Sequence, residues 1–190
     1  MSGTSFNPNL SSLMYNIVMV DDIGVEGNNE VGVYPYQIKT RKVGKVSDDL
    51  VAEVVDTMKD VFIRLGYQDE PPEIVSISQG AVILPSGEEI EACYGYDQPG
   101  VPGRIYVSTE GSKKSFGKSK IPVHVAAAAF AAHEAVEHVN NMRGKTLLSS
   151  HKKIKPEDHT SDTEVEANRI AREIVGIRYG WTVKFGDENL

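Results

Sequence analysis

The sequence predicts an α+β fold in which two long helices follow a small sheet. Three observations support this class. A segment with apolar residues at helical spacing begins at Ser47, and short alternating segments separated by glycine and proline follow it between residues 73 and 108. Two further segments, at 122–143 and 161–178, have no internal proline. Because helices and strands do not alternate regularly, the sheet is expected to be mostly antiparallel or mixed.

Length and composition fit one globular domain. The 190 residues are 40% hydrophobic and 25% charged, which suffices for an ordinary buried core. The formal net charge of -7 disfavours nucleic acid and anionic membranes as partners. A single cysteine, Cys93, rules out an internal disulfide framework and suits a reducing compartment. Neither a secretory signal nor a membrane span is visible, so we expect a cytoplasmic protein.

Residues 1–46 are expected to form an N-terminal arm with irregular strands, and residues 47–190 the main domain. The first twelve residues are polar, and residues 13–20 are apolar enough for a strand. Glycine and proline within residues 31–38 allow an irregular edge strand at best. An arm of this kind suits docking to a partner.

Residues 47–65 are predicted to form a helix. Ser47 is a good N-cap, the two aspartates after it complement the helix dipole, and Gly66 ends the helix. The apolar residues recur at helical spacing and should be buried against the sheet. They are Leu50, Val54, Met58, Val61, Phe62 and Leu65.

The period changes after this helix. Strands are expected at residues 73–78, 81–84, 89–96 and 104–108, with the second and third joined by a turn. Residues 109–120 are expected to be a loop. Its glycines and lysines resemble a phosphate-binding loop, but five residues instead of four separate the glycines, which disfavours nucleotide binding.

Two helices and a short strand complete the predicted chain. Pro122 suits the first turn of a helix that runs to about residue 143, before Gly144. Ser161 and Glu164 resemble a capping box that opens the last helix, which ends near Gly180. The final residues 181–185 are expected to dock as a short strand.

The clearest chemical signal lies on the helix of residues 122–143. The segment His133-Glu134-Ala135-Val136-Glu137-His138 places two imidazoles and two carboxylates within six positions. A catalytic zinc site needs three protein ligands, an open position for water and a carboxylate beside that water. A His-Glu pair on a helix, followed within about one turn by a second ligand, is typical of such sites.

Two assignments of the second ligand remain open. In a regular helix residues four apart face the same way, so His133 and Glu137 bind the metal and His138 faces elsewhere. With a one-residue π-bulge, His138 moves round to join His133. Zinc accepts both imidazole and carboxylate, so ligand chemistry does not choose between the two.

The third ligand must come from another element. Glu164 and Glu166, near the start of the last predicted helix, are the candidates. His151 and His159, in the preceding polar segment, are further substitutes.

At these residues the chain resembles the zincin metallopeptidases, most closely the ImmA/IrrE-type proteins. The resemblance rests on His133-Glu134 in an alanine-rich helix and on the later Glu166-Ala167-Asn168, and it covers roughly residues 47–178. It implies a zincin-like order of helix, sheet, metal-binding helix and C-terminal helix. It also implies that strand 104–108 is the sheet edge that holds an extended substrate.

The resemblance implies a role for each matching residue. Glu134 would be the general base, and His133 and Glu166 would be ligands of zinc or of another divalent transition metal. Glu164 would support or replace Glu166, and His138 or Glu137 would complete the ligand set. The chain departs from the family at Glu137, where the family has histidine. The one-residue insertion before His138 is similar to the dipeptidyl-peptidase III pattern.

The expected function is therefore a zinc-dependent metallopeptidase that acts on a peptide or protein substrate. An alternative is a catalytically degenerate zincin fold that serves as a binding or structural module. Docking through the N-terminal arm, as in a viral or phage assembly, would suit that alternative.

Overall fold

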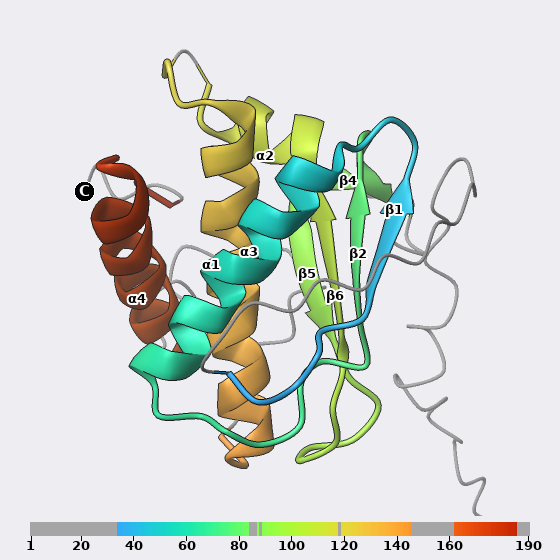
Figure 1. The fold of residues 1–190 in the computed structure, drawn as a ribbon, viewed down its shortest axis with the longest axis vertical. Helices are drawn as coiled ribbons and strands as arrows, with labels where there is room; N and C mark the ends of the chain where they lie inside the picture. Colours follow the sequence, from blue (N-terminus) through green and yellow to red (C-terminus); the bar gives the residue numbers. More distant parts are fainter. Residues whose placement is uncertain (1–33, 84–86, 88, 118, 146–161, 186–190) are drawn as a thin grey trace, which may run out of the picture.

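The computed structural model describes residues 34–83, 87, 89–117, 119–145 and 162–185. The described chain has a sheet on one side and three long helices packed together on the other (Figure 1). Its elements are, in order, β1 (Thr40–Val43), α1 (Asp48–Arg64), β2 (Ile74–Ser78), β3 (Val82–Ile83), β4 (Glu89–Ile90), β5 (Ala92–Gly95), β6 (Arg104–Ser108), α2 (Thr109–Ser115), α3 (Val123–Met142) and α4 (Asp162–Tyr179).

Helix α1 begins and ends where its sequence predicts. The Ser47 hydroxyl accepts a hydrogen bond from the Leu50 N–H at 3.3 Å, and Gly66 has a φ of 59°, a conformation that favours glycine. Leu50 and Leu65 were expected in the core but are only partly buried at its margin. The other four predicted core residues of α1 are fully buried: Val54, Met58, Val61 and Phe62.

The main sheet is mixed, and its strand order is β1-β2-β6-β5. Strands β1, β2 and β6 run parallel, while β5 runs antiparallel to β6. Strands β3 and β4 form a separate two-stranded antiparallel sheet. The predicted α+β class with a small mixed sheet is thus confirmed, although most of the pairing in the main sheet is parallel.

Three strand predictions need correction. Residues 89–96 do not form one strand, because only β4 pairs with β3, while β5 joins the main sheet. Strand β6 pairs on both sides and is therefore interior, whereas β5 is the last strand on that side of the sheet. Residues 34–38 form no strand; residues 31–33 of that expected strand, and all of residues 13–20, lie outside the described residues.

The packed domain begins earlier in the chain than residue 47. Strand β1 pairs in parallel with β2, and Tyr34 and Ile38 are buried in the hydrophobic core. The segment from Tyr34 to Val46 therefore belongs to the domain and not to an arm. The prediction missed β1 because Arg41 and Lys42 interrupt its apolar pattern at a sheet edge, where such charges are tolerated.

Two segments near the long helices also differ from expectation. Residues 109–115 form helix α2, whose N-cap Ser108 accepts a hydrogen bond from the Gly111 N–H at 2.8 Å. The expected glycine–lysine loop is therefore mostly helical. Residues 181–185 dock as predicted, with Val183 and Phe185 buried, but they form no strand.

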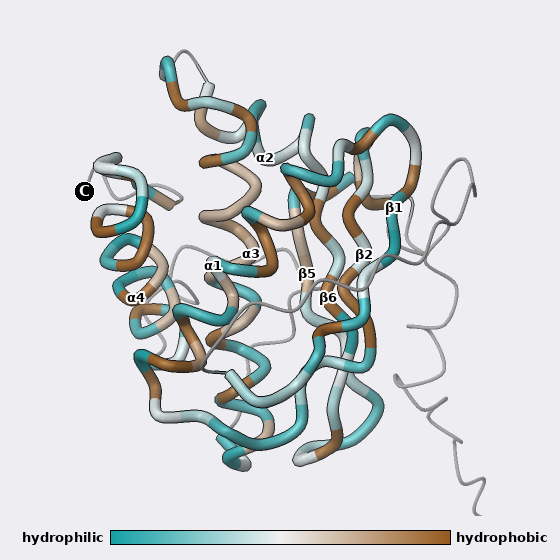
Figure 2. Tube along the Cα trace, viewed as in Figure 1, coloured by the Kyte–Doolittle hydropathy of each residue, from teal (hydrophilic) through white to brown (hydrophobic). Residues whose placement is uncertain are grey.

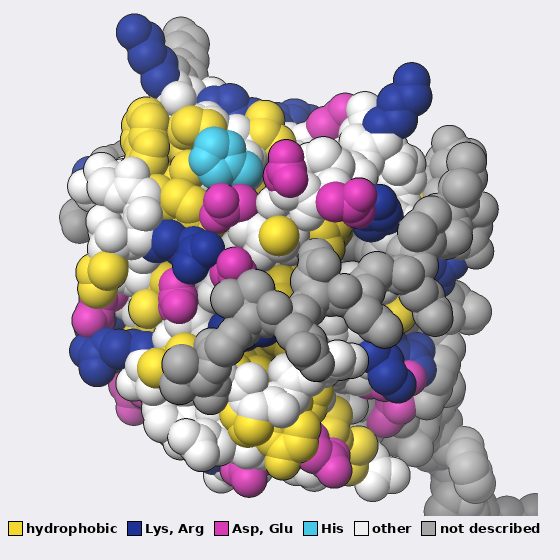
Figure 3. Space-filling model, viewed as in Figure 1, with side chains coloured by type: hydrophobic (Ala, Val, Ile, Leu, Met, Phe, Trp, Pro, Cys, Tyr) yellow, Lys and Arg dark blue, Asp and Glu magenta, His cyan; other side chains and the backbone are white. Residues whose placement is uncertain are grey.

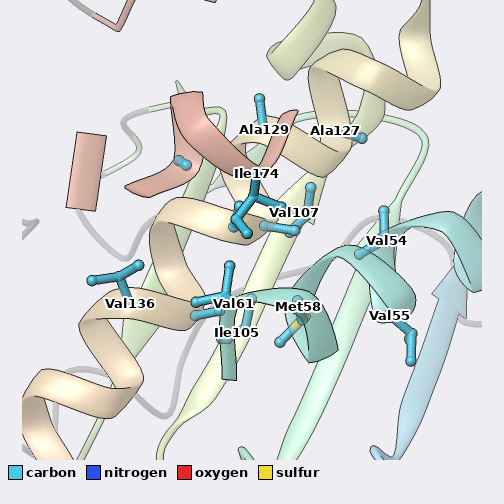
Figure 4. Packing of buried hydrophobic residues seen from close by; sticks show 14 of the residues in the cluster. Val54, Val55, Met58, Val61, Ile105, Val107, Ala127, Ala129, Val136 and Ile174 are labelled. Atoms are coloured by element: carbon cyan, nitrogen blue, oxygen red, sulfur yellow. The ribbon is translucent and has the colours of Figure 1, made fainter. Parts of the chain in front are cut away.

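Helix α3 lies at the centre of the described structure and packs against α1, α2, α4 and the sheet. Its many alanines are fully buried, and their small side chains let neighbouring elements approach closely. Figure 4 shows Met58 of α1, Ile105 of β6 and Ile174 of α4 within the same hydrophobic cluster. Along α1 and the strands, hydrophobic positions alternate with hydrophilic ones (Figure 2).

Acidic and basic side chains are interspersed over the described residues of the face in Figure 3. None of the described helices combines the length and the apolar character needed to cross a lipid bilayer.

Candidate metal centre

Helix α3 carries a group of buried polar side chains in its middle. It is a regular α-helix from Val123 to Met142, so His133 and Glu137 lie one turn apart on the same face. Glu134 is their neighbour on the same helix, and all three are at most 9% exposed. Helix α3 packs against α4, which places a fourth group, the carboxylate of Glu164, beside His133.

The imidazole of His133 is oriented by α4. Its Nδ1 donates a hydrogen bond to Asn168 Oδ1 at 3.0 Å, which leaves the Nε2 lone pair free to bind a metal. Nε2 lies 3.8 Å from Glu137 Oε1 and 3.6 Å from Glu164 Oε2. An acceptor behind one ring nitrogen and oxygen donors in front of the other form the usual surroundings of a histidine ligand.

The donor spacing suits one ion. Two ligands at about 2.1 Å from a tetrahedral ion lie about 3.4 Å apart, only a few tenths of an ångström less than the two distances from His133. One donor atom each from His133, Glu134 and Glu137 also lie within 4.8 Å of one another. The group can therefore hold a metal ion with small side-chain movements.

Two carboxylates of the cluster, those of Glu134 and Glu137, are buried at an electrostatic cost. Glu134 Oε2 is buried and has no hydrogen-bond partner among the described residues. Burial raises the pKa of Glu134 well above its usual range, and the charge of Glu137 and a hydrogen bond to it raise it further. Burial also raises the pKa of Glu137, against the opposing effect of His133. A divalent cation would remove this electrostatic cost.

Strand β5 approaches the cluster from the sheet side. The backbone of Tyr94 hydrogen-bonds to Glu134, so the outermost described strand of the main sheet lies next to the carboxylate. The neighbouring Cys93 is fully buried. Burial raises the pKa of its thiol well above the usual range, with smaller contributions from Glu134 and Glu137, so Cys93 remains a neutral thiol.

His138 is not part of the cluster. Its Nε2 donates to the Glu70 carbonyl oxygen at 3.0 Å, and its Nδ1 accepts from the Tyr94 hydroxyl at 3.2 Å. The same hydroxyl accepts hydrogen bonds from Asn141 Nδ2 and from the Gly103 N–H. Both nitrogens of His138 are thus occupied, and the regular α3 gives no π-bulge that would turn it toward His133.

Glu166 does not face His133 either. Its Oε2 lies 2.7 Å from Lys145 Nζ at a partly exposed site, and this hydrogen bond lowers the pKa of Glu166. Glu164, two residues earlier, takes the place beside His133 that was expected for Glu166. The expected substitutes His151 and His159 lie outside the described residues.

The role of Asn168 was missed, although a sequence signal existed. Glu164 and Asn168 are four residues apart, so one face of α4 carries both. Asn168 Nδ2 also donates to Glu164 Oε1 at 3.4 Å, which links the two groups that contact His133. By contrast, no sequence signal indicated that the Tyr94 backbone would reach Glu134.

Comparison with known proteins leaves the site to be interpreted from its own atoms. No family model matches the chain, and neither a curated protein nor a solved structure matches it.

Proposed function

We propose that this protein is a metal-dependent peptidase that uses zinc or another divalent transition metal. His133, Glu137 and Glu164 would hold the ion, and Glu134 would act as general base. Zincin-type metallopeptidases are the family that the motif on α3 resembles. One observation supports the proposal above all others: the lone pair of His133 Nε2 faces two buried carboxylates at 3.6 and 3.8 Å.

When bound, a divalent ion supplies Lewis acidity, which polarises a carbonyl oxygen and lowers the pKa of a nearby water. Glu134 removes a proton from this water and passes it to the leaving amine. Burial raises the pKa of Glu134, which favours its acceptance of a proton. Asn168 holds His133 in the tautomer that presents Nε2.

The decisive experiment separates Glu134 from the ligands. Wild type and Glu134→Gln are each loaded with zinc and incubated with a diverse peptide library, and cleavage is followed by mass spectrometry. The variant should keep its metal, measured by elemental analysis, and lose turnover by roughly 10²–10⁴-fold, because the glutamine amide cannot accept the proton.

A matched control is Glu166→Gln, which changes the same residue type at the Lys145 ion pair. It should keep both metal and turnover. Equal cleavage by wild type and Glu134→Gln would remove Glu134 from the mechanism. A metal-loaded wild type that cleaves no library peptide would contradict the peptidase proposal.

A second candidate function rests on the burial of the cluster. His133, Glu134, Glu137 and Glu164 are each at most 9% exposed, which is low for a centre that must admit a peptide. A metal ion could instead join α3 to α4 in a binding or structural module. In that case metal raises the melting temperature, and wild type shows no turnover on any substrate.

A further inference from the structure

The donor set of the cluster differs from that of a typical zinc helix. Such a helix presents two imidazoles one turn apart, whereas α3 presents His133 and Glu137 in that relation. The group that α4 contributes is again a carboxylate, Glu164. The centre thus offers one nitrogen donor and two anionic oxygen donors, with a third carboxylate, Glu134, close by.

Ligand type affects metals unequally. Zinc is a borderline-soft ion that gains strongly from imidazole, whereas carboxylate oxygens suit harder ions such as Mn²⁺ and Mg²⁺. Nearly every site binds zinc more tightly than manganese, so the informative quantity is the ratio of the two dissociation constants. Replacing one imidazole by a carboxylate lowers the ratio of the Mn²⁺ dissociation constant to the Zn²⁺ dissociation constant.

The number of bonds that the site can offer also favours harder ions over zinc. Each carboxylate has two oxygens and can bind an ion through one or both. Glu164 Oε2 lies 3.6 Å from His133 Nε2, and its Oε1 lies 3.4 Å from Asn168 Nδ2. Two carboxylates of this kind can supply more than two bonds, which favours ions of five or six ligands over four-coordinate zinc.

We propose that Glu137 sets the metal selectivity of this centre, so that it discriminates weakly between zinc and harder divalent ions such as Mn²⁺. This inference rests on the proposed metal centre and deepens it. The charge balance agrees, since Glu137 and Glu164 together neutralise a divalent ion while His133 adds no charge as a neutral imidazole.

The test compares dissociation constants for Zn²⁺ and Mn²⁺, measured on the full chain by competition with a metallochromic chelator. Glu137→His supplies a second imidazole on the same face and should raise the Mn²⁺-to-Zn²⁺ ratio of dissociation constants by on the order of tenfold. Glu166→His introduces the same residue at the exposed Lys145 pair and should leave the ratio unchanged within about twofold.

Glu137→Gln covers the case in which Glu137→His fails to fold. It preserves the shape of the side chain and removes an anionic oxygen, so Mn²⁺ affinity should fall further than Zn²⁺ affinity. An unchanged or lowered ratio in the folded variants overturns the selectivity proposal and leaves the metal centre standing. Failure of wild type to bind either ion overturns the metal centre itself.

Discussion

Two histidines of α3, His133 and His138, lie five positions apart and are both buried, yet their surroundings differ in kind. His138 uses both ring nitrogens on neutral partners, the Glu70 carbonyl oxygen and the Tyr94 hydroxyl. His133 uses one nitrogen on Asn168 and directs the other at carboxylates. A complete neutral network stabilises a fold, whereas charged groups with too few partners cost stability and indicate a ligand.

The strongest test of this contrast removes a carboxylate from α4. Glu164→Ala should weaken metal affinity about a thousandfold or more, near 4 kcal/mol, because a two-ligand site remains. Glu166→Ala should change affinity less than about threefold, since its carboxylate pairs with Lys145. Isothermal titration with zinc measures both variants. Equal losses would mean that Glu166 also reaches the ion.

The next test uses the pH dependence of His138. Burial lowers the pKa of His138 to about 4 from its ordinary 6.5. Below pH 6.5 the His138 imidazole is protonated in the unfolded chain but not in the folded one. The free energy of unfolding is therefore highest above pH 6.5 and falls as the pH approaches 4. The loss should total about 3 kcal/mol and then level off. Denaturant titrations of metal-free protein across this range measure it.

The groups that face His138 do not titrate in this window. Burial raises the pKa of Tyr94 to about 12 and raises that of Tyr67 as well, so both stay neutral. Burial also raises the pKa values of Glu134 and Glu137, and comparison with His138→Gln removes their contribution to the pH profile. The variant should lack the loss. If wild type and variant have the same pH profile, the network around His138 is not what the geometry indicates.

A smaller effect is expected at Tyr94, which joins β5 to α3. Tyr94→Phe removes the hydroxyl that serves His138, Asn141 and the Gly103 N–H, and should cost roughly 1–2 kcal/mol by leaving buried donors unpaired. Tyr36→Phe at an exposed ring should cost less than about 0.5 kcal/mol. Metal affinity should be unchanged in both, because the Tyr94 contact with Glu134 is made by backbone.

The sequence predicted the features that depend on local signals. Ser47 and Gly66 bound α1 through capping and glycine conformation, which involve only neighbouring residues. The regular spacing on α3 likewise put His133 and Glu137 on one face. These assignments needed no knowledge of tertiary packing.

The features that depend on packing could not be predicted. Glu164 and Glu166 differ by about 200° around α4, and nothing local decides which of them faces α3. The rotation of α4 against the alanine-rich face of α3 makes that choice. Strand order also depends on packing. The sequences of β5 and β6 both fit a strand, and only the pairing of β6 with β2 makes β6 interior and leaves β5 outermost.

The smallest effect, and the one of opposite sign, belongs to the charged cluster. Burial raises the pKa of Glu137, which means that the ionised carboxylate destabilises the metal-free fold at neutral pH. Glu137→Gln keeps the shape and removes the charge, so metal-free protein should gain about 1 kcal/mol. Glu166→Gln should instead lose up to about 0.5 kcal/mol, because it breaks an exposed ion pair.

Denaturant unfolding in excess chelator at pH 7 measures the stability of both variants. With saturating zinc, wild type should be more stable to unfolding than Glu137→Gln, since zinc binding to the folded state favours the protein that keeps its ligand. A Glu137→Gln variant that is less stable than wild type without metal would show that this carboxylate belongs to the fold, as His138 does, and not to a site.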